Sequence, residues 1–412
     1  MIIKFIKKVT AIGLSIVMLL PNVAFGASQR FSDGFSKSSI ISDFDTGRVI
    51  YEKNPDEKSA MASMTKIMTL LLTFDAIKEK KVSPNDVITI EESDVNREGT
   101  NIKLEKGEKI TLKKLMEGMM IVSANDAALA IARHVGGSYE KFNDMMNNKA
   151  KEIGMKNTTF YNPNGLPYKI NADGSSTENT TTARDVLTLS KWMYAHYPKE
   201  LTEITNQEKL VDSKKQIDEK NTNPLLPLIK NVDGLKTGFT SKAGYCLAYS
   251  MKTDKGDGND DSNRLLGVTM GAGTERDRQS SAYNSLVFIN QYYKTKILYE
   301  KDKEITTTNL NDSDRLNAKV FAKKDVKTLK RVDENFKEKI NYKKISIKDA
   351  KKKPIGELVV TDKYDNIVTK SDIYMNVSDL SFTSKIRLYF GALKNQIKGV
   401  NSTGEYPVFT LK

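Results

Sequence analysis

The chain has 412 residues, 39% of them hydrophobic and only 10 of them proline, which is ordinary for a globular protein with a sizeable core and room for two or three domains. The single cysteine, Cys246, excludes an intramolecular disulfide bond, and its apolar neighbours indicate a buried, inert thiol. The formal net charge of +13 suits an anionic envelope polymer or anionic lipid, or it only keeps the protein soluble.

The first 26 residues have the pattern of a secretory signal peptide. Three lysines precede an apolar run, Val9–Leu20, that is too short to favour a membrane span, and Ala24-Phe25-Gly26 supplies small residues for cleavage near Ala27. We therefore expect an exported protein at the outer face of the cytoplasmic membrane or in the cell wall, where nucleic acid is not a partner. An uncleaved membrane anchor is the alternative.

Helical patterns dominate the segment that follows an N-terminal hairpin. Ser39–Tyr51 alternates apolar and polar residues around a turn, which predicts two paired strands. Ala62–Ile77 carries apolar residues at helical spacing, and Thr111–Val135 is a second helical region interrupted near Ser123-Ala124-Asn125. A threonine pair then caps a predicted helix over Ala183–Tyr194.

After Pro227 the pattern changes to strands. Gly244–Lys252 and Arg264–Gly271 are apolar runs around a polar loop and predict an antiparallel pair, and Gln279–Tyr293 returns to helical spacing. Helices and strands are thus segregated along the chain. This order predicts an α+β fold, an antiparallel sheet flanked by helices, for a catalytic domain over residues 28–298.

Two smaller elements are expected at the C-terminus. Residues 315–380 are rich in lysine and predict a small all-β domain, with short strands at Ile345–Ile347, Gly356–Val360 and Ile373–Val377. Phe382–Ile397 places apolar residues on one helical face and basic residues off it. We expect residues 381–398 to form an amphipathic helix that binds an anionic membrane surface; packing on the β domain is the alternative.

Ser63 and Lys66 carry the chemistry of a serine nucleophile with a lysine base. In a helix, residues three apart lie on the same face, so the two side chains can meet. A serine hydroxyl needs a base, and a lysine serves only when it is neutral. Burial and a second cation, for which Lys236 is the candidate, both lower the pKa of a lysine. Ser138 and Lys141 share this spacing, but an exposed helix surface explains them.

Two further short motifs supply polar groups. Ser123 can relay a proton, and the side-chain amide of Asn125 can hold both Lys66 and a substrate amide. Lys236-Thr237-Gly238 is expected on a strand that lines the site. Lys236 would supply positive charge, Thr237 a hydroxyl for a carboxylate, and Gly238 room for a ligand near the backbone.

Other chemistries find little support. His134 and His196 are the only histidines, and nothing indicates a serine–histidine–aspartate triad. No histidine or cysteine spacing indicates zinc, and Gly271-Ala272-Gly273 does not complete a dinucleotide-binding motif. We expect no metal and no cofactor.

The three motifs together, in this order, closely resemble the low-molecular-mass penicillin-binding proteins, the D-alanyl-D-alanine carboxypeptidase family of serine peptidases. The resemblance runs from about Ser39 to Tyr293 and includes the turn Asn162–Leu166 and the context of Ser123-Ala124-Asn125. It implies a β-lactamase/transpeptidase-like fold with a helical subdomain. It also implies removal of the terminal D-alanine from peptidoglycan stem peptides through an acyl-enzyme at Ser63, and covalent binding of β-lactam antibiotics.

The same resemblance implies two more parts of the site. The oxyanion would be held by the backbone N–H groups of Ser63 and Phe239. Arg278, with Arg276 close behind it, would help to bind the terminal carboxylate; a solvated surface arginine is the alternative. Some family members carry a second basic residue upstream of Lys236, where this chain has Asn221-Thr222-Asn223.

Three rival functions share parts of this pattern. A class A β-lactamase needs a Glu-x-x-Leu-Asn element, and Glu178-Asn179 lacks that spacing. A catalytically inactive peptidoglycan-binding protein should have lost a motif residue, and none is lost. Endopeptidase or transpeptidase action on cross-links stays open as a side activity.

Overall fold

The computed structural model describes residues 31–376 except 96–97, 171–172, 174–175, 254–262, 311–312, 344 and 351, and after residue 376 only 383, 386, 408 and 409. The predicted signal peptide over residues 1–26 lies outside the described residues, as does all but two residues of the amphipathic helix predicted over 381–398. Among the described residues, no helix is long and apolar enough to cross a membrane.

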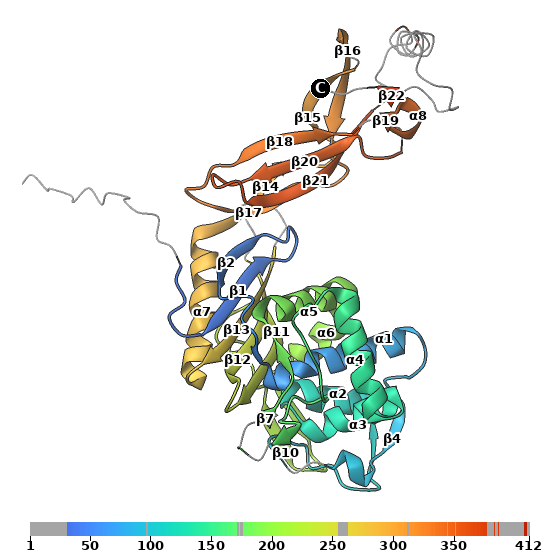
Figure 1. Ribbon diagram of the computed structural model, residues 1–412, viewed down its shortest axis with the longest axis vertical. Coiled ribbons are helices and arrows are strands. Elements are labelled where there is room, and N and C mark those ends of the chain that lie inside the picture. The colour runs from blue at the N-terminus through green and yellow to red at the C-terminus, as the bar shows by residue number, and fades with distance from the viewer. Residues whose placement is uncertain are drawn as a thin grey trace, which may run out of the picture. The chain divides into compact units, whose positions relative to one another are not determined.

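A five-stranded antiparallel sheet in the order β11-β12-β13-β1-β2 organises residues 31–292, which we call the N-terminal unit (Figure 1). Its strands are β1 (Ser38–Asp43), β2 (Val49–Lys53), β11 (Val232–Thr240), β12 (Gly244–Lys252) and β13 (Arg264–Ala272). The predicted hairpin β1–β2 and the predicted pair β12–β13 are both confirmed. β1 also pairs with β13, with Ser39 opposite Thr269, so the first hairpin closes against strands far along the chain.

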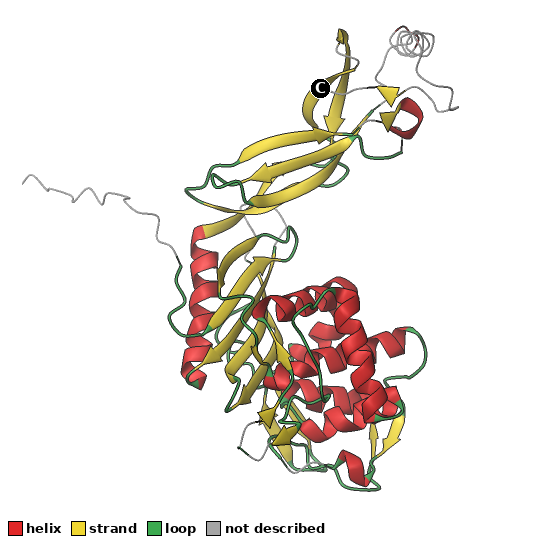
Figure 2. Cartoon of the chain, viewed as in Figure 1, coloured by secondary structure: helices red, strands yellow, loops and turns green. Residues whose placement is uncertain are grey.

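Helices cover both faces of this sheet (Figure 2). Successive residues of a strand point to opposite faces, and here Ile40 packs into the core beneath the helical layer while Ile41 packs with α7 (Glu275–Tyr292) on the other face. The predicted α+β fold is therefore confirmed. The helical layer holds η1 (Ala62–Thr65), α1 (Lys66–Lys78), η2 (Glu92–Asp94), α2 (Leu112–Ile121), α3 (Asn125–Gly136), α4 (Tyr139–Ile153), α5 (Ala183–His196) and α6 (Pro198–Thr205).

The starts of two helices show where the local sequence pattern predicts the first residue correctly and where it does not. Thr182 caps α5 by accepting a hydrogen bond from the Asp185 N–H, as predicted. α7 begins after a cap at Thr274, earlier than the predicted start at Gln279, because its first turn is polar and shows no apolar periodicity. Short paired strands connect these helices: β3 (Ser59–Ala60) with β8 (Thr180–Thr181), β4 (Val87–Thr89) with β5 (Lys109–Thr111), β6 (Lys169–Ile170) with β7 (Ser176–Thr177), and β9 (Lys209–Asp212) with β10 (Ile217–Lys220).

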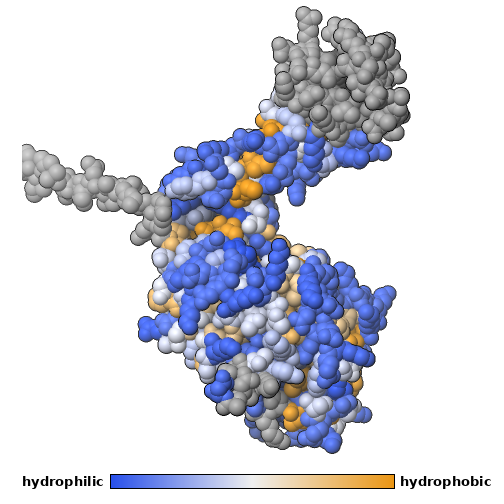
Figure 3. Space-filling model, viewed as in Figure 1, coloured by the Kyte–Doolittle hydropathy of each residue, from blue (hydrophilic) through white to orange (hydrophobic). Residues whose placement is uncertain are grey.

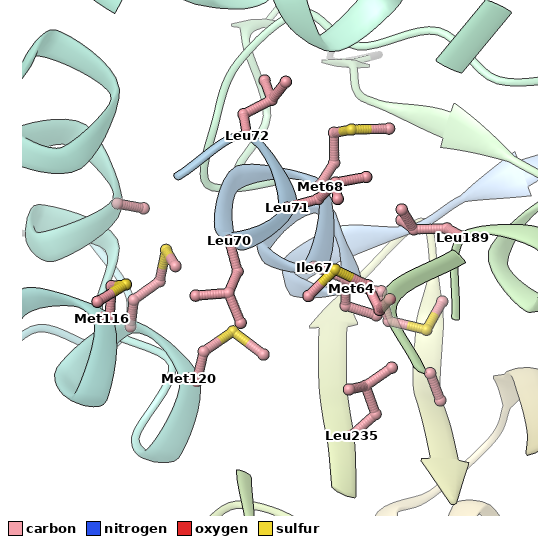
Figure 4. Packing of buried hydrophobic residues seen from close by; sticks show 14 of the residues in the cluster. Met64, Ile67, Met68, Leu70, Leu71, Leu72, Met116, Met120, Leu189 and Leu235 are labelled. Carbon is pink, nitrogen blue, oxygen red and sulfur yellow. The ribbon is translucent and has the colours of Figure 1, made fainter. Parts of the chain in front are cut away.

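The buried helix α1 is the centre of the core. It is covered on every side, which explains why its sequence is apolar almost all round. Figure 4 shows Leu70 directed toward Met120 of α2, with Leu189 of α5 and Leu235 of β11 also in the cluster. This packing fixes the N-terminal end of α1, where Ser63 and Lys66 lie, against the sheet.

A second, curled sheet with the order β15-β16-β21-β20-β18 forms the C-terminal region. Its strands are β15 (Glu304–Leu310), β16 (Ser313–Phe321), β18 (Lys337–Tyr342), β20 (Gly356–Thr361) and β21 (Ile367–Met375), and β14 (Tyr293–Tyr299) pairs with β17 (Val326–Arg331) beside it. The strand predicted at Ile345–Ile347 is only β19 (Ile345–Ser346), which pairs with β22 (Val408–Phe409) and is followed by the short helix α8 (Ile347–Ala350). On the face drawn in Figure 3, hydrophilic residues predominate and apolar residues form small patches.

Candidate active site

Ser63 lies in η1, at the point where the chain enters α1. The turn Asn162–Pro167 packs directly behind it. A Cβ atom on Gly165 would lie only 2.0 Å from the Ala62 carbonyl oxygen, and Gly165 has a φ of +85°, so only glycine allows this approach. Ala62 itself has a φ of +46°. The serine is therefore held on a tightly packed backbone.

Lys66 is fully buried beneath Ser63, at 0% exposure. Its Nζ lies 2.9 Å from Ser63 Oγ and 2.7 Å from Asn125 Oδ1. It also donates to the carbonyl oxygen of Asn164 at 2.7 Å. The predicted meeting of Ser63, Lys66 and Asn125 is confirmed by these distances. The Asn164 carbonyl is a partner that sequence reasoning missed, although the turn that carries it stood out.

Burial and a neighbouring cation act together on Lys66. Loss of hydration lowers the pKa of its ammonium well below the ordinary value, and the positive charge of Lys236 lowers it further. The carboxylate of Asp126 opposes this effect. Within the part of the chain that the structure describes, Lys66 makes no ion pair. The expected direction of the Lys66 pKa, and the part of Lys236 in it, are thus as predicted.

Ser123 lies in the break between α2 and α3, and Asn125 is the first residue of α3. Ser123 has a φ of +70°, a left-handed conformation that non-glycine residues adopt at a cost of order 1 kcal/mol. Asn125 Nδ2 donates to the Glu98 carbonyl oxygen at 3.0 Å, which fixes the amide so that its Oδ1 faces Lys66. The interruption predicted between the two helices is therefore the feature that aims the amide.

Lys236, Thr237 and Gly238 lie on β11, as predicted. Lys236 is 1% exposed, and its Nζ donates to the Thr237 carbonyl oxygen at 3.2 Å. A Cβ atom on Gly238 would lie 2.9 Å from the Met61 carbonyl oxygen and 3.1 Å from Ser63 N. The absence of a side chain at Gly238 is thus what lets β11 pass close to the serine.

Thr237 has a partner that sequence reasoning did not identify. Its Oγ1 lies 2.8 Å from Thr222 Oγ1. Thr222 stands in the segment where some family members carry a basic residue. A neutral hydroxyl therefore occupies this edge of the site.

Arg278 projects from α7 and is 4% exposed, so it is not the solvated surface arginine that was the alternative. Its guanidinium donates to Glu275 Oε1 at 2.6 Å, and in the described chain its Nε makes no hydrogen bond. Burial, with the charge of Arg278 as a second cause, lowers the pKa of Lys236 to about 7. The charge of Arg278 on α7 thus acts on Lys236 of β11.

Phe239 ends the Lys-Thr-Gly segment at the surface. Its side chain is 52% exposed, and its ring centroid lies 4.3 Å from that of Tyr245. Its backbone follows Gly238, next to Ser63. The residue is therefore placed by its main chain, with the ring facing solvent.

The groups set aside at the sequence level have other partners. His134 Nε2 lies 3.1 Å from Asp86 Oδ2, and His196 stacks on Trp192. Cys246 is fully buried, as predicted, and burial raises the pKa of its thiol to about 11. Among the described residues, no group of three or more histidine, cysteine or acidic side chains could hold a metal ion.

The assembled groups are those of an acyl-transfer site. A hydroxyl contacts a buried amine whose pKa is lowered, and that amine is held by an amide and a carbonyl. A second buried cation, Lys236, and the hydroxyl of Thr237 lie on the neighbouring strand β11, and the hydroxyl of Thr222 lies beside Thr237. The arrangement can form a serine ester and attract a carboxylate.

Comparison with known proteins agrees with this chemistry. Residues 25–274 match the peptidase S11 family, described as D-alanyl-D-alanine carboxypeptidase. The chain is 33% identical over 324 residues to the D-alanyl-D-alanine carboxypeptidase DacF of Bacillus subtilis, covering 78% of each chain. It is also 33% identical over 306 residues to DacC of Escherichia coli, covering 72% of each.

Two solved structures have similar folds. Penicillin-binding protein 5 of Haemophilus influenzae superposes with a TM-score of 0.69 at 25% identity, over 85% of this chain and 98% of that one. Penicillin-binding protein D2 of Listeria monocytogenes, in its ampicillin-bound form, superposes with a TM-score of 0.53 at 27% identity, over 63% of this chain and 98% of that one.

Proposed function

The chain belongs to the D-alanyl-D-alanine carboxypeptidase family and is a serine hydrolase of peptidoglycan stem peptides that binds β-lactams, and from this premise we propose that Ser63 is its nucleophile and Lys66 its base. The observation that carries the proposal is the set of three contacts at the Lys66 amine.

These contacts match a neutral amine. A neutral amine has two N–H donors and one lone pair. Asn125 Oδ1 and the Asn164 carbonyl oxygen can accept both N–H groups. When Lys66 is neutral, its lone pair is left toward Ser63 Oγ, 2.9 Å away, and can accept the serine proton. Burial and the charge of Lys236 lower the pKa of Lys66, which favours the neutral amine.

Acylation follows from this arrangement. Ser63 Oγ forms a bond to the carbonyl carbon between two D-alanines while its proton passes to Lys66. The carbon–nitrogen bond then breaks, and the leaving D-alanine amine takes a proton from Lys66, directly or through Ser123. A β-lactam carbonyl would react at the same atom, with its ring nitrogen as the leaving group.

The remaining residues bind the substrate. Lys236 and Arg278 attract the terminal carboxylate, and Thr237 donates its hydroxyl to it. Asn125 also holds the substrate amide. A Cβ atom on Gly238 would lie only 3.1 Å from Ser63 N, so the backbone just before Phe239 passes close to the serine N–H. This closeness supports an oxyanion site formed by the N–H groups of Ser63 and Phe239.

Deacylation needs an activated water, and two routes are open: Lys66 takes the water's proton directly, or Ser123 relays it. Glu178-Asn179 lacks the spacing of the Glu-x-x-Leu-Asn element that class A β-lactamases need for deacylation, and the Glu178 carboxylate accepts the hydroxyl of Thr240 at 2.7 Å. Neither route uses a glutamate base.

The direct test is release of D-alanine from a muramyl pentapeptide by purified Ala27–Lys412, beside the Ser63→Ala variant. We expect release by the first protein and none by the second. No release from correctly folded wild-type protein would contradict the activity, whereas release by Ser63→Ala would contradict only the nucleophile.

We further propose that the protein is exported and that residues 381–398 attach it to an anionic membrane surface. The basic amphipathic pattern of that segment supports the proposal. Sedimentation with anionic vesicles tests it. We expect binding by Ala27–Lys412 and its loss on deletion of residues 381–412; unchanged binding after deletion would refute the attachment.

A further inference from the structure

Glu178 and Asn179 are buried beside the site and have no part in the proposed steps. Their exposures are 3% and 0%, although both are polar and stand in a loop directly before β8. Buried polar side chains are costly unless hydrogen-bonded, so their partners indicate what they hold.

Asn179 is bonded to the segment that carries the serine. Its carbonyl oxygen accepts the N–H of Met61 at 3.1 Å, and its Nδ2 donates to Thr65 Oγ1 at 2.9 Å. These two bonds lie on either side of Ser63 in sequence. β8 then continues the attachment by pairing with β3.

The same amide holds the turn behind the serine. Asn179 Oδ1 accepts the N–H of Tyr161 at 2.6 Å, and its Nδ2 donates to the Asn162 carbonyl oxygen at 2.9 Å. That turn supplies the Asn164 carbonyl that holds Lys66. One buried side chain thus joins both segments that surround the nucleophile.

Glu178 is bonded to the opposite wall. Its Oε2 accepts the hydroxyl of Thr240 at 2.7 Å, and Thr240 Oγ1 in turn accepts the N–H of Ala243 at 3.0 Å. Thr240 is the last residue of β11 and follows Phe239. Adjacent residues in one loop therefore hold the serine segment on one side and the end of β11 on the other.

We propose that Glu178-Asn179 is a clip that sets the separation between the backbone N–H of Ser63 and that of Phe239. This inference rests on the proposed function, because those two groups form its oxyanion site. Both members of the clip are positioning residues: they act through Met61, Thr65 and Thr240.

The clip predicts a particular kinetic signature. Oxyanion donors stabilise the charge that develops in the transition state more than the bound ground state, so loosening one wall lowers the acylation rate and leaves ground-state binding nearly unchanged. Removing a whole donor costs about 100- to 1,000-fold, and a displaced donor costs less. We therefore expect about a tenfold loss of the acylation rate constant when the Glu178–Thr240 bond is removed.

The test compares Glu178→Ala with Glu178→Gln in the full chain, using a fluorescent penicillin as the probe. The glutamine amide oxygen can accept the Thr240 hydroxyl, so the Gln variant should acylate at close to the wild-type rate while the Ala variant loses about tenfold. The dissociation constant before acylation and the pH dependence of acylation should not change, because Lys66 keeps its contacts. Thr240→Ser should behave as wild type and Thr240→Ala as Glu178→Ala.

The double variant Glu178→Ala/Thr240→Ala should lose no more than either single variant, since both remove one bond. Wild-type acylation by both alanine variants would overturn the clip. An equal loss of acylation rate in Glu178→Gln and Glu178→Ala would overturn the clip too. The glutamine can still accept the Thr240 hydroxyl, so an equal loss would mean that Glu178 acts in some way other than through this bond. If Glu178→Ala does not fold, the Thr240 pair tests the same bond. The proposed function fails separately, if folded wild-type protein releases no D-alanine, and the assignment of Ser63 as the nucleophile fails if Ser63→Ala still acylates.

Discussion

In the N-terminal unit Lys66 and Lys236 are buried and make no ion pair among the described residues, whereas in the C-terminal sheet the side chains of Lys319 and Lys337 are 66% and 61% exposed and each lies beside a carboxylate. Burial of an ammonium without a counterion costs stability, and an exposed lysine on a sheet costs almost none. Lysine therefore lowers the stability of the fold where it is buried in the N-terminal unit, and hardly changes it where it is exposed in the C-terminal sheet. The region that bears the cost is the one that holds the site.

Among the predicted effects of substitution in the two regions, the largest is expected at Lys66. Lys66→Ala should lower acylation by a fluorescent penicillin by about a thousandfold, because the serine loses its base and the amine that orients Asn125. Stopped-flow fluorescence measures the rate, and circular dichroism confirms the fold. Normal labelling of this variant would show that another group activates Ser63.

The pH dependence sharpens the comparison between the two buried lysines. As the proposed base, Lys66 must be neutral, so kcat/KM should rise with pH through its lowered pKa. In its proposed role, Lys236 attracts the carboxylate only while protonated, so kcat/KM should fall as pH rises through about 7, by up to about tenfold for each further unit. A pH profile of D-alanine release measures both limbs, and a constant kcat/KM from pH 7 to 9 would contradict the part given to Lys236.

Arg278→Ala should raise the KM for the peptide by about tenfold with a smaller change in kcat, because a charge-assisted contact to the substrate carboxylate is lost. The variant should also shift the alkaline decrease of kcat/KM to higher pH, since the charge of Arg278 helps to lower the pKa of Lys236. Steady-state kinetics at several pH values give both numbers. Unchanged kinetics would refute the assignment.

The smallest effect is expected in the C-terminal sheet. Lys337→Ala removes a surface ion pair with Asp365 at 2.9 Å and should change the free energy of unfolding by less than about 0.5 kcal/mol. D-Alanine release should stay at the wild-type rate. Thermal unfolding and the release assay measure the two; a loss of activity here would remove the distinction between the regions.

Sequence patterns predicted the groups that we propose to react, and Asn125 as a group that holds Lys66, but not the other groups that hold them. Ser63 and Lys66 meet because they are three positions apart in one turn, which is a local fact. The Asn164 carbonyl reaches Lys66 from a distant turn, and Thr222 reaches Thr237 from another segment. Such contacts depend on how separate segments pack, which no local spacing encodes. At the level of sequence, Glu178-Asn179 indicated only that the Glu-x-x-Leu-Asn spacing of a class A β-lactamase is not present there.

The same reasoning explains the strands that were missed. β15 reads Glu-Ile-Thr-Thr-Thr-Asn-Leu and has few apolar residues, so alternation gave little signal. Its place in the sheet comes from pairing with β16. β12 and β13 were predicted because both of their faces are largely buried and their sequences are mostly apolar.

The pairing of β1 with β13 has a consequence for how the molecule is made. Ser42 lies opposite Leu266, so ribosomes adding roughly 5–20 residues per second must work for on the order of 10–40 s before the partner of β1 exists. During that time β1 has only β2 beside it and presents a bare edge to other chains. The sheet thus closes through contacts between residues far apart in the chain, and topologies of this kind fold slowly.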